Sequence, residues 1–122
     1  MKFLLDANFL LIPGNFKVDV FSELQNFGNP ELYTIDLVIK ELESLASGRG
    51  ADARAAKLSL LLIKEKRVQI IETKGKNTDK ELEKLAEEGY IVCTQDKELI
   101  KRLKTSKLKV IYLRKKKILA EG

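Results

Sequence analysis

The stretch Phe3-Leu4-Leu5-Asp6 decides how the rest of the sequence is interpreted, because it is an unbroken apolar run that ends at an acid. Apolar residues in succession, without polar alternation, are typical of a strand buried on both faces of a parallel sheet. Similar runs, which predict four more strands, are residues 32–35, 68–71, 90–93 and 110–113. Ligands of such sheets bind beyond the carboxyl ends of the strands, so Asp6 marks a candidate site.

Helix-like segments separate these strands. The predicted helices cover residues 18–27, 37–46, 51–66, 78–88 and 97–103. We expect Pro13-Gly14 to break the chain, Asp36 to cap the second helix, and Thr78 to open the fourth with capping-box spacing. The alternation predicts an α/β fold with three α/β/α layers around a central parallel sheet of four to five strands. We expect one domain, residues 1–122, with a basic C-terminal segment from about residue 114.

The composition excludes several kinds of chemistry. The 122 residues include no His and one Cys, which rules out His-dependent nucleophile pairs, His-containing metal sites and internal disulfides. Acid–base or metal chemistry must therefore rely on carboxylates, which select hard cations such as Mg²⁺ or Mn²⁺. The apolar runs are shorter than the ~20 residues of a membrane span, and the N-terminus has no signal-peptide pattern. We therefore expect a cytoplasmic protein.

The net charge of +5 is unevenly distributed. Residues 1–96 carry 13 basic and 16 acidic side chains, whereas residues 97–122 carry 10 basic and 2 acidic ones. A basic segment favours a polyanionic partner, because neutralised phosphates release condensed counterions. A solvated, Lys-rich surface explains the same charge equally well.

Two carboxylates are placed unlike ordinary surface charges. Asp6 ends the first predicted strand, where a simple strand-end turn is the alternative explanation. Glu41 lies on the apolar stripe of its predicted helix, four residues after Leu37 and four before Leu45. A carboxylate on such a stripe needs a cation, a bound metal or the edge of a cavity. A Glu41 paired with Lys or Arg at the stripe edge is the alternative.

Asp79 and Asp96 are expected to return to the same edge of the sheet. The helix after Asp79 advances about 15 Å, and the following strand returns about 16 Å. Each acid also has a local explanation, because Asp79 suits a helix first turn and Asp96 an N-cap. Together with Asp6 and Glu41, however, they predict a crevice of mutually repelling carboxylates. Mg²⁺ or Mn²⁺ is the natural occupant of such a site.

The residues in these positions resemble a known family. The runs Phe3-Leu4-Leu5-Asp6-Ala7-Asn8-Phe9-Leu10, Val38-Ile39-Lys40-Glu41-Leu42, Thr78-Asp79 and Ile91-Val92-Cys93-Thr94-Gln95-Asp96 are similar to those of PIN domains, from Met1 to about Leu113. The resemblance implies a metal-dependent ribonuclease of α/β/α fold. It implies that Asp6, Glu41, Asp79 and Asp96 form the catalytic quartet, that Asp6, Asp79 and Asp96 bind the metal, and that Asn8 and Thr94 support it.

The implied activity is hydrolysis of phosphodiester bonds in single-stranded RNA, with Mg²⁺ or Mn²⁺ activating a water. Basic residues expected to follow the RNA backbone are Arg49, Arg54, Lys97, Lys101, Arg102, Arg114 and Lys115, with Lys116 and Lys117 beside them. The run Asp6 to Leu10 and residues 110–114 most resemble the ribosomal-RNA-processing branch of the family. A toxin-type ribonuclease, restrained by an inhibitory protein, and a ribosome-assembly partner are the other roles considered.

Other interpretations of the same residues stay open. A catalytically silent RNA-binding scaffold and a phosphatase or receiver with Asp6 as nucleophile are the competing functions. Phe9, Phe16 and Tyr33 are candidates for base stacking, although ordinary packing explains them better. Cys93 is expected in the core. The apolar run Leu58 to Ile63 is expected to pack in the core, with a homodimer contact as the alternative.

Overall fold

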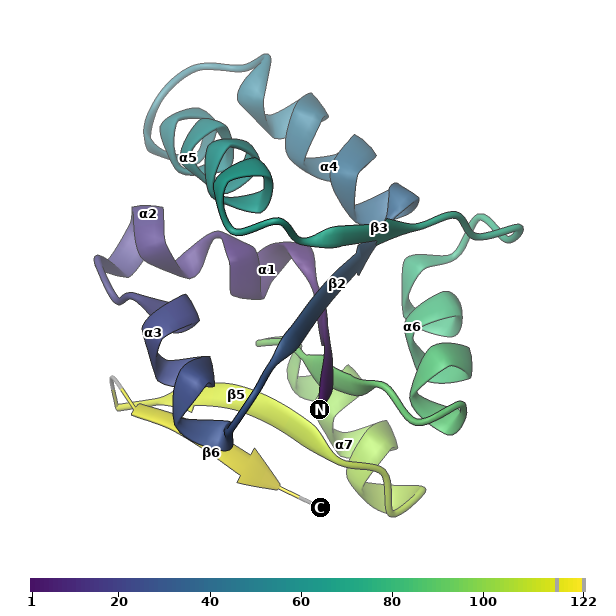
Figure 1. Ribbon diagram of the computed structural model, residues 1–122. Coiled ribbons are helices and arrows are strands. Elements are labelled where there is room, and N and C mark those ends of the chain that lie inside the picture. Colours follow the sequence, from purple (N-terminus) through teal and green to yellow (C-terminus); the bar gives the residue numbers. More distant parts are fainter. Residues whose placement is uncertain (116, 122) are drawn as a thin grey trace.

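A computed structural model describes residues 1–115 and 117–121 as a sheet flanked by helices (Figure 1). The strands are β1 (Lys2–Leu5), β2 (Glu31–Ile35), β3 (Gln69–Ile71), β4 (Ile91–Cys93), β5 (Val110–Arg114) and β6 (Lys117–Glu121). The helices are α1 (Ala7–Leu10), α2 (Ile12–Phe16), α3 (Val20–Leu24), the 3₁₀ turn η1 (Gln25–Phe27), α4 (Asp36–Ala46), α5 (Ala51–Glu65), α6 (Thr78–Glu87) and α7 (Lys97–Thr105). The predicted α/β fold is confirmed.

Strand β1 lies inside the sheet, whose order is β3-β2-β1-β4-β5-β6. Neighbours among the first five strands in this order are parallel, as predicted, and β6 pairs antiparallel with β5. The chain order reverses beside β1, because β2 and β3 lie on one side of it and β4 and β5 on the other. This reversal point is where open α/β sheets bind ligands, and Asp6 follows β1 there.

The apolar runs form the core. Phe3, Leu4 and Leu5 have no exposed surface, and neither have Val92 and Cys93 on the neighbouring strand. Burying each large apolar side chain contributes roughly 1.5–3 kcal/mol relative to exposure. The sheet centre is therefore a rigid support for the polar residues that follow β1 and β4.

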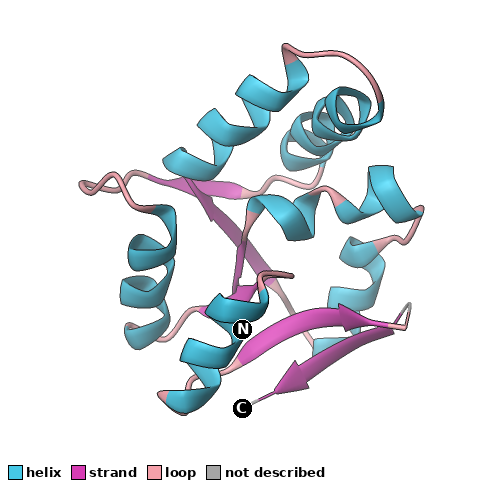
Figure 2. Ribbon diagram, turned by 180° about the vertical axis from the view of Figure 1, so that it is seen from behind, coloured by secondary structure: helices cyan, strands magenta, loops and turns pink. Residues whose placement is uncertain are grey.

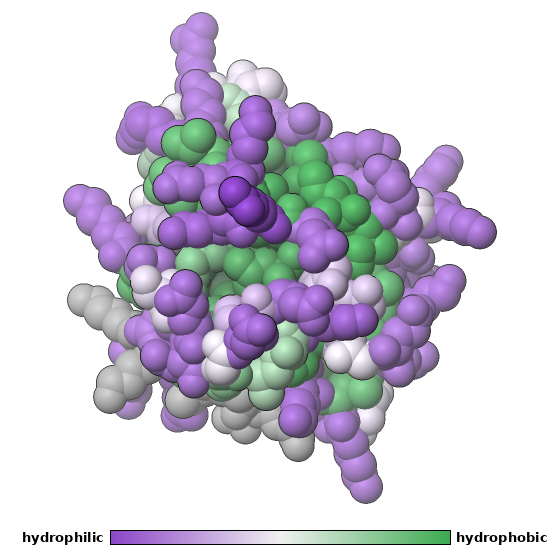
Figure 3. Space-filling model, in the orientation of Figure 1, coloured by the Kyte–Doolittle hydropathy of each residue, from purple (hydrophilic) through white to green (hydrophobic). Residues whose placement is uncertain are grey.

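Most of the helices form two groups, and α3 packs instead against η1 and β6. One group contains α1, α2, α4 and α5, in which α5 packs against both α2 and α4. The other contains α6 and α7, which contact each other and pack against β4 and β5, as the reverse view in Figure 2 also shows. On the face drawn in Figure 3, an apolar area is ringed by hydrophilic side chains. None of the described helices is long and apolar enough to cross a membrane.

The predicted break at Pro13-Gly14 is wrong. Pro13 lies in the first turn of α2, where its missing N–H is not needed, and the helix continues to Phe16. The chain then turns at Lys17, whose φ is +57°. Gly14 serves a packing role, because a Cβ atom there would lie 2.6 Å from Cα and 2.7 Å from Cβ of Ala55. The glycine lets α2 approach α5 closely.

The fourth predicted helix begins at Thr78, as expected, but the capping residues of two helices differ from the prediction. Asp36 is the first residue of α4 and follows Ile35, which is the N-cap. Its carboxylate instead accepts hydrogen bonds from the backbone N–H and the hydroxyl of Thr73, at 3.1 and 2.6 Å. Asn77, not Thr78, caps α6 by accepting from the N–H of Lys80 at 3.0 Å. Local polar patterns thus placed each cap within one residue of its position.

Strand β6 was not predicted. The basic segment expected from about residue 114 begins at the end of β5 and turns at Lys115, whose φ is +49°. The chain then returns antiparallel to β5 over Lys117–Glu121. Lys116, part of the same basic run, lies outside the described residues.

Replacing Gly14 by Ala should destabilise the protein, because the new methyl group would overlap the α5 backbone. Overpacking of this kind typically costs about 1–3 kcal/mol of unfolding free energy. Chemical denaturation measures the loss. The matched control is Asn15→Ala, since Asn15 is exposed on the same helix and should change stability by less than about 0.5 kcal/mol. Equal stability of the two variants would contradict the close approach of α2 and α5.

Candidate active site

Asp6 lies at the carboxyl end of β1 with 5% of its surface exposed. Its Oδ1 atom accepts a hydrogen bond from the backbone N–H of Ala7 at 2.8 Å and so caps α1. Its Oδ2 atom accepts from the hydroxyl of Thr94, also at 2.8 Å. Beside it, the buried Thr34 hydroxyl donates to the Leu5 carbonyl at 2.7 Å. Every buried polar side-chain atom among the described residues has a hydrogen-bond partner.

Thr94 connects Asp6 to two further polar residues. Its Oγ1 atom accepts from the backbone N–H of Asp96 at 3.1 Å and lies 3.2 Å from Oδ1 of Asn8. The same Asn8 oxygen accepts from the backbone N–H of Gln95 at 2.9 Å. Asn8 and Thr94, the two residues expected to support the site, therefore lie beside Asp6. They follow the ends of two neighbouring parallel strands, β1 and β4.

Glu41 and Asp79 face Asp6. The pKa of Asp6 is raised from 3.8 to about 6, mainly because burial disfavours its charged form, and then by the negative charges of Glu41 and Asp79. The hydrogen bonds from Thr94 and Ala7 oppose this rise. The pKa of Glu41 is also raised, first by partial burial and then by Asp79. The charges of Glu41 and Asp79 therefore act on Asp6, which places the three acids within electrostatic range of one another.

Glu41 is not a core residue, however. The predicted stripe is buried at Val38 and Leu42, whereas Glu41 is exposed one position before Leu42. The prediction that Glu41 points into the apolar stripe is therefore corrected, because the residue lies at the stripe edge that borders the acids. Among the described residues, the ion pairs link Arg102 to other acids and none includes Glu41.

Arg102 is positioned toward the acids. Its guanidinium donates to Asp79 at 3.2 Å, forms a second ion pair with Glu83, and lies 4.0 Å from Glu98 on its own helix. These groups hold the pKa of Arg102 above its usual value, chiefly through Glu83. Arg102, expected among the RNA-contacting residues, is thus engaged by carboxylates of α6 and α7.

Asp96 is joined to this group less directly. Its carboxylate accepts from the N–H groups of Glu98 and Leu99, at 3.0 and 3.3 Å, and caps α7. The N-cap explanation for Asp96 is therefore correct, while its backbone N–H still reaches Thr94. Among the described residues, no three acidic or sulfur ligands stand close enough together to hold one ion. Asp6, Glu41 and Asp79 therefore interact through their charges, and Asp96 is connected to Asp6 through Thr94.

The predicted RNA-contacting residues fall in separate places. Lys97 and Lys101 lie exposed on α7, Arg114 ends β5, and Lys115 forms the turn after it. Arg49 and Arg54 lie at the turn between α4 and α5 and at the start of α5, on the far side of the molecule from α7 (Figure 1). The structure therefore brings the C-terminal basic residues to the α7–β5 side and leaves Arg49 and Arg54 apart.

The aromatic candidates behave mostly as packing residues. Phe9 is completely buried, whereas Phe16 is 65% exposed. The rings of Tyr33 and Tyr90 meet edge to face with centroids 5.2 Å apart. Cys93 is a core residue, as expected, and burial raises the pKa of its thiol.

Sequence reasoning missed Tyr112 and Gln95. Both line a groove between α7 and β5, described below. The available signal was alternation along β5, which places Tyr112 and Arg114 on one face of the strand. Because residues 110–113 are all apolar or aromatic, the sequence predicts one fully buried strand, and the alternation between the two faces is overlooked.

Three comparisons relate this architecture to known proteins. Residues 3–116 match the family described as PIN like domain. The chain is 32% identical over 113 residues to Ribonuclease VapC9 of Archaeoglobus fulgidus, covering 92% of this chain and 82% of that protein. The chain belongs to the PIN-like domain family. The solved PIN domain endonuclease Utp24 superposes with a TM-score of 0.81 at 24% identity, covering 98% of this chain and 90% of that one, which confirms the fold.

The PIN-like site has a donor set suited to a hard divalent cation. Asp6, Glu41 and Asp79 offer oxygen ligands only. Burial, and to a smaller extent the charges of Glu41 and Asp79, raises the pKa of Asp6, and a bound divalent cation would favour its charged form. Asp6 is already buried and fixed by two hydrogen bonds, as a metal-orienting carboxylate requires. The chemistry of these donors therefore suits Mg²⁺ or Mn²⁺, although the described acids are not close enough together to enclose an ion.

Replacing Asp6 by Asn should stabilise the metal-free PIN-like domain at neutral pH. Because the folded state raises the pKa of Asp6 to about 6, the charged carboxylate destabilises the fold above that pH. The penalty disappears as pH falls toward 3.8, the value of the unfolded chain. We expect Asp6→Asn to add up to about 3 kcal/mol of unfolding free energy at pH 7.5 and almost none at pH 4. Chemical denaturation with chelator present measures both values.

The hydrogen bonds around Asp6 can survive this change. The amide oxygen of Asn can accept from Ala7, and its NH₂ group can donate to Thr94, whose hydroxyl then turns to Asn8 at 3.2 Å. Glu43→Gln is the control, since Glu43 is exposed on α4. An Asp6→Asn protein no more stable than the wild type at pH 7.5 would contradict the electrostatic strain at Asp6.

Replacing Thr94 by Val should remove the hydroxyl while preserving its buried shape. The change leaves the carboxylate of Asp6 and the N–H of Asp96 without their partner, at a cost of roughly 1–3 kcal/mol. It should also raise the pKa of Asp6 further, because the Thr94 hydrogen bond lowers it. Carbon-detected NMR titration of the Asp side chains measures this. Thr94→Ser keeps the hydroxyl and should keep the wild-type pKa; a shift as large as that of Val would contradict the role of the hydrogen bond.

Proposed function

We propose that this chain is a Mg²⁺- or Mn²⁺-dependent endoribonuclease that hydrolyses phosphodiester bonds in single-stranded RNA. The observation that supports it most directly is the buried Asp6 carboxylate facing Glu41 and Asp79 at the reversal point of the sheet. A relative at 32% identity is named a ribonuclease, which supports the same activity.

Each acid has a proposed task. Asp6, Asp79 and Asp96 hold the metal, and Glu41 completes the catalytic quartet from α4. A divalent cation held by these residues would supply activation of a water and neutralisation of charge on the phosphodiester. Asp6 is oriented by Thr94 and Ala7, while Asn8 keeps the end of β4 against the end of β1. Asp79 is held from outside by Arg102, which keeps its carboxylate at the mouth of the site.

We assign substrate binding to attraction between basic side chains and the phosphates of the RNA. In this proposal Lys97, Lys101, Arg114 and Lys115 contact phosphates near the site, and Arg49 and Arg54 contact a more distant part of the RNA. Arg102, whose side chain stays 44% exposed beside Asp79 and Glu83, would add a further phosphate contact. An unstructured strand suits this arrangement, because its phosphates can adapt to separated basic residues.

Cleavage of an unstructured RNA tests the activity. We expect cleavage with Mn²⁺ or Mg²⁺ and none with chelator. Asp6→Asn and Asp96→Asn should each reduce cleavage by more than the ~10–100-fold typical of changes outside the ligand shell. Calorimetric titration with Mn²⁺ should show binding to the wild type and loss of it in Asp6→Asn. The control is Asp52→Asn, because Asp52 is exposed on α5. Cleavage retained by both acid variants would refute the assignment.

The ion pair between Arg102 and Asp79 favours one alternative, a catalytically silent RNA-binding or ribosome-assembly scaffold. It neutralises an acid of the quartet without any metal. A scaffold would bind RNA in a salt-dependent manner but show neither Mn²⁺ binding nor turnover.

Within the ribonuclease proposal, the resemblance of Asp6 to Leu10 and of residues 110–114 supports ribosomal RNA processing in the cytoplasm. A toxin-type ribonuclease, controlled by an inhibitory protein, is the alternative. Sequencing RNA ends after expression of the wild type and of Asp6→Asn separates the two. New ends confined to ribosomal RNA precursors support processing, whereas new ends across other RNAs support the toxin role.

A further inference from the structure

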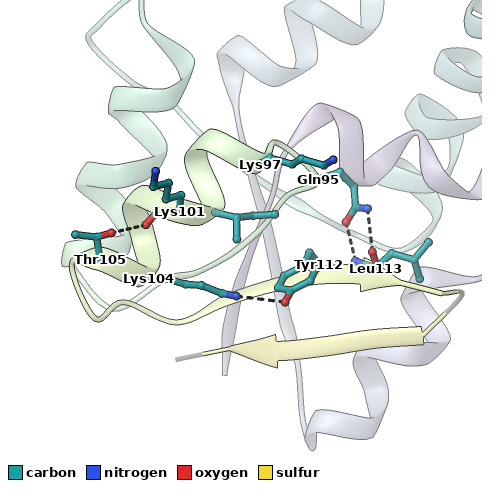
Figure 4. Close-up of a pocket in the computed structure, with 8 residues that line it drawn as sticks. Gln95, Lys97, Lys101, Lys104, Thr105, Tyr112 and Leu113 are labelled. Carbon is teal, nitrogen blue, oxygen red and sulfur yellow. Dashed lines mark hydrogen bonds between the residues drawn. The ribbon is translucent and has the colours of Figure 1, made fainter.

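A groove of about 530 Å³ lies between α7 and β5, outside the acidic crevice. Figure 4 shows Lys97, Lys101 and Lys104 along α7, opposite Tyr112 on β5, with Gln95 at one end. The three lysines are exposed and spaced four and three residues apart, so they follow one side of the helix. Among the described residues that line the groove, none is acidic.

The groove combines positive charge with an aromatic and apolar surface. Lys104 donates from Nζ to the Tyr112 hydroxyl at 3.3 Å and lies 5.0 Å from the centre of its ring. Half-buried Ile100 and Leu113 extend the apolar surface. A cationic rim beside an aromatic ring matches the two parts of a nucleotide, since phosphates bind lysines and bases stack on aromatic faces.

Gln95 makes the groove continuous with the acidic site. Its backbone N–H donates to Asn8, beside Asp6, at 2.9 Å. Its side chain, which lines the groove, pairs with the Leu113 backbone by accepting at 2.6 Å and donating at 3.2 Å. One residue therefore borders both places, and its side-chain direction is fixed by two hydrogen bonds.

We propose that this groove binds the nucleotide that flanks the scissile phosphodiester of a single-stranded RNA. Its base takes the place of the Lys104 ammonium on the Tyr112 ring, and neighbouring phosphates bind Lys97 and the displaced Lys104. The inference rests on the proposed ribonuclease function and adds a base platform to it. A single strand is required because a paired base cannot leave its duplex stack to reach the ring. An acidic peptide would use the lysines but not the ring.

The charge part is tested by binding of a fluorescein-labelled octauridylate to Asp6→Asn protein, followed by anisotropy without divalent cations. In that background, Lys97→Gln with Lys104→Gln should weaken binding and lower the slope of log K against log[salt] by about 1.4, since each phosphate contact contributes about 0.7 for single strands. The matched control is Lys57→Gln with Lys64→Gln, two exposed lysines equally spaced on α5. Equal slopes in the two double variants would overturn the proposal.

The aromatic part is tested at Tyr112. Tyr112→Phe keeps the ring and should retain binding within about twofold, whereas Tyr112→Leu removes it and should weaken binding at least about fivefold. Thermal unfolding shows whether the Leu variant is folded, and a folded Leu variant that binds like Phe would overturn the base platform. Inorganic polyphosphate or an octaglutamate peptide bound as tightly as the RNA would overturn it too.

Cleavage by the wild type distinguishes this inference from the proposed function. Mn²⁺-dependent cleavage together with unchanged salt slopes refutes the groove and leaves the ribonuclease intact. Groove-dependent binding without any cleavage at saturating Mn²⁺ refutes the ribonuclease, and with it the position of the groove beside a scissile bond. Loss of binding in the groove variants together with wild-type cleavage supports both.

Discussion

The hydrogen bond from the Thr94 hydroxyl to the Asp6 carboxylate joins residues 88 positions apart, and the site depends on it. It links the carboxyl ends of β1 and β4. These two strands are neighbours because the strand order reverses beside β1. The same hydroxyl accepts from Asp96, so one oxygen positions the end of β1 and the start of α7. Because Thr94 is completely buried, this contact cannot be replaced by water without a cavity.

The fold tolerates the buried carboxylate of Asp6 because the residues around it stabilise the protein enough to offset its cost. Asp6 follows three residues with no exposed surface, and burial raises its pKa against two opposing hydrogen bonds. Arg102 reduces the negative charge on the Asp79 side, although both of its main carboxylate partners are partly exposed and the pairs are screened by solvent. A buried carboxylate with other acids nearby is unfavourable without a counter-charge, so the rigid core around Asp6 is what keeps it in place.

The sequence predicted the elements at this edge of the sheet where the fixed lengths of helices and strands allow few arrangements. A buried run ending at Asp6 and a helix–strand return from Asp79 to Asp96 both follow from fixed rises per residue. The errors arose where tertiary contacts decide. Pro13-Gly14 is helical because Gly14 must approach Ala55, a contact 41 residues away. Glu41 lies at a stripe edge because packing buries α4 along Val38 and Leu42, which leaves Glu41 exposed beside them.

Helix α7 divides the basic C-terminal charge between two tasks. Arg102 is directed to the acids of α6, whereas Lys97 and Lys104 border the groove against β5. Lys101 borders the cavities on both sides of the helix. The helix begins at the Asp96 cap, whose N–H is bound to Thr94, so its lysines keep a constant position relative to Asp6. The net charge of this segment therefore hides two different environments. Helix α7 directs Arg102 to carboxylates, and it directs Lys97 and Lys104 to the groove, where a polyanion could bind.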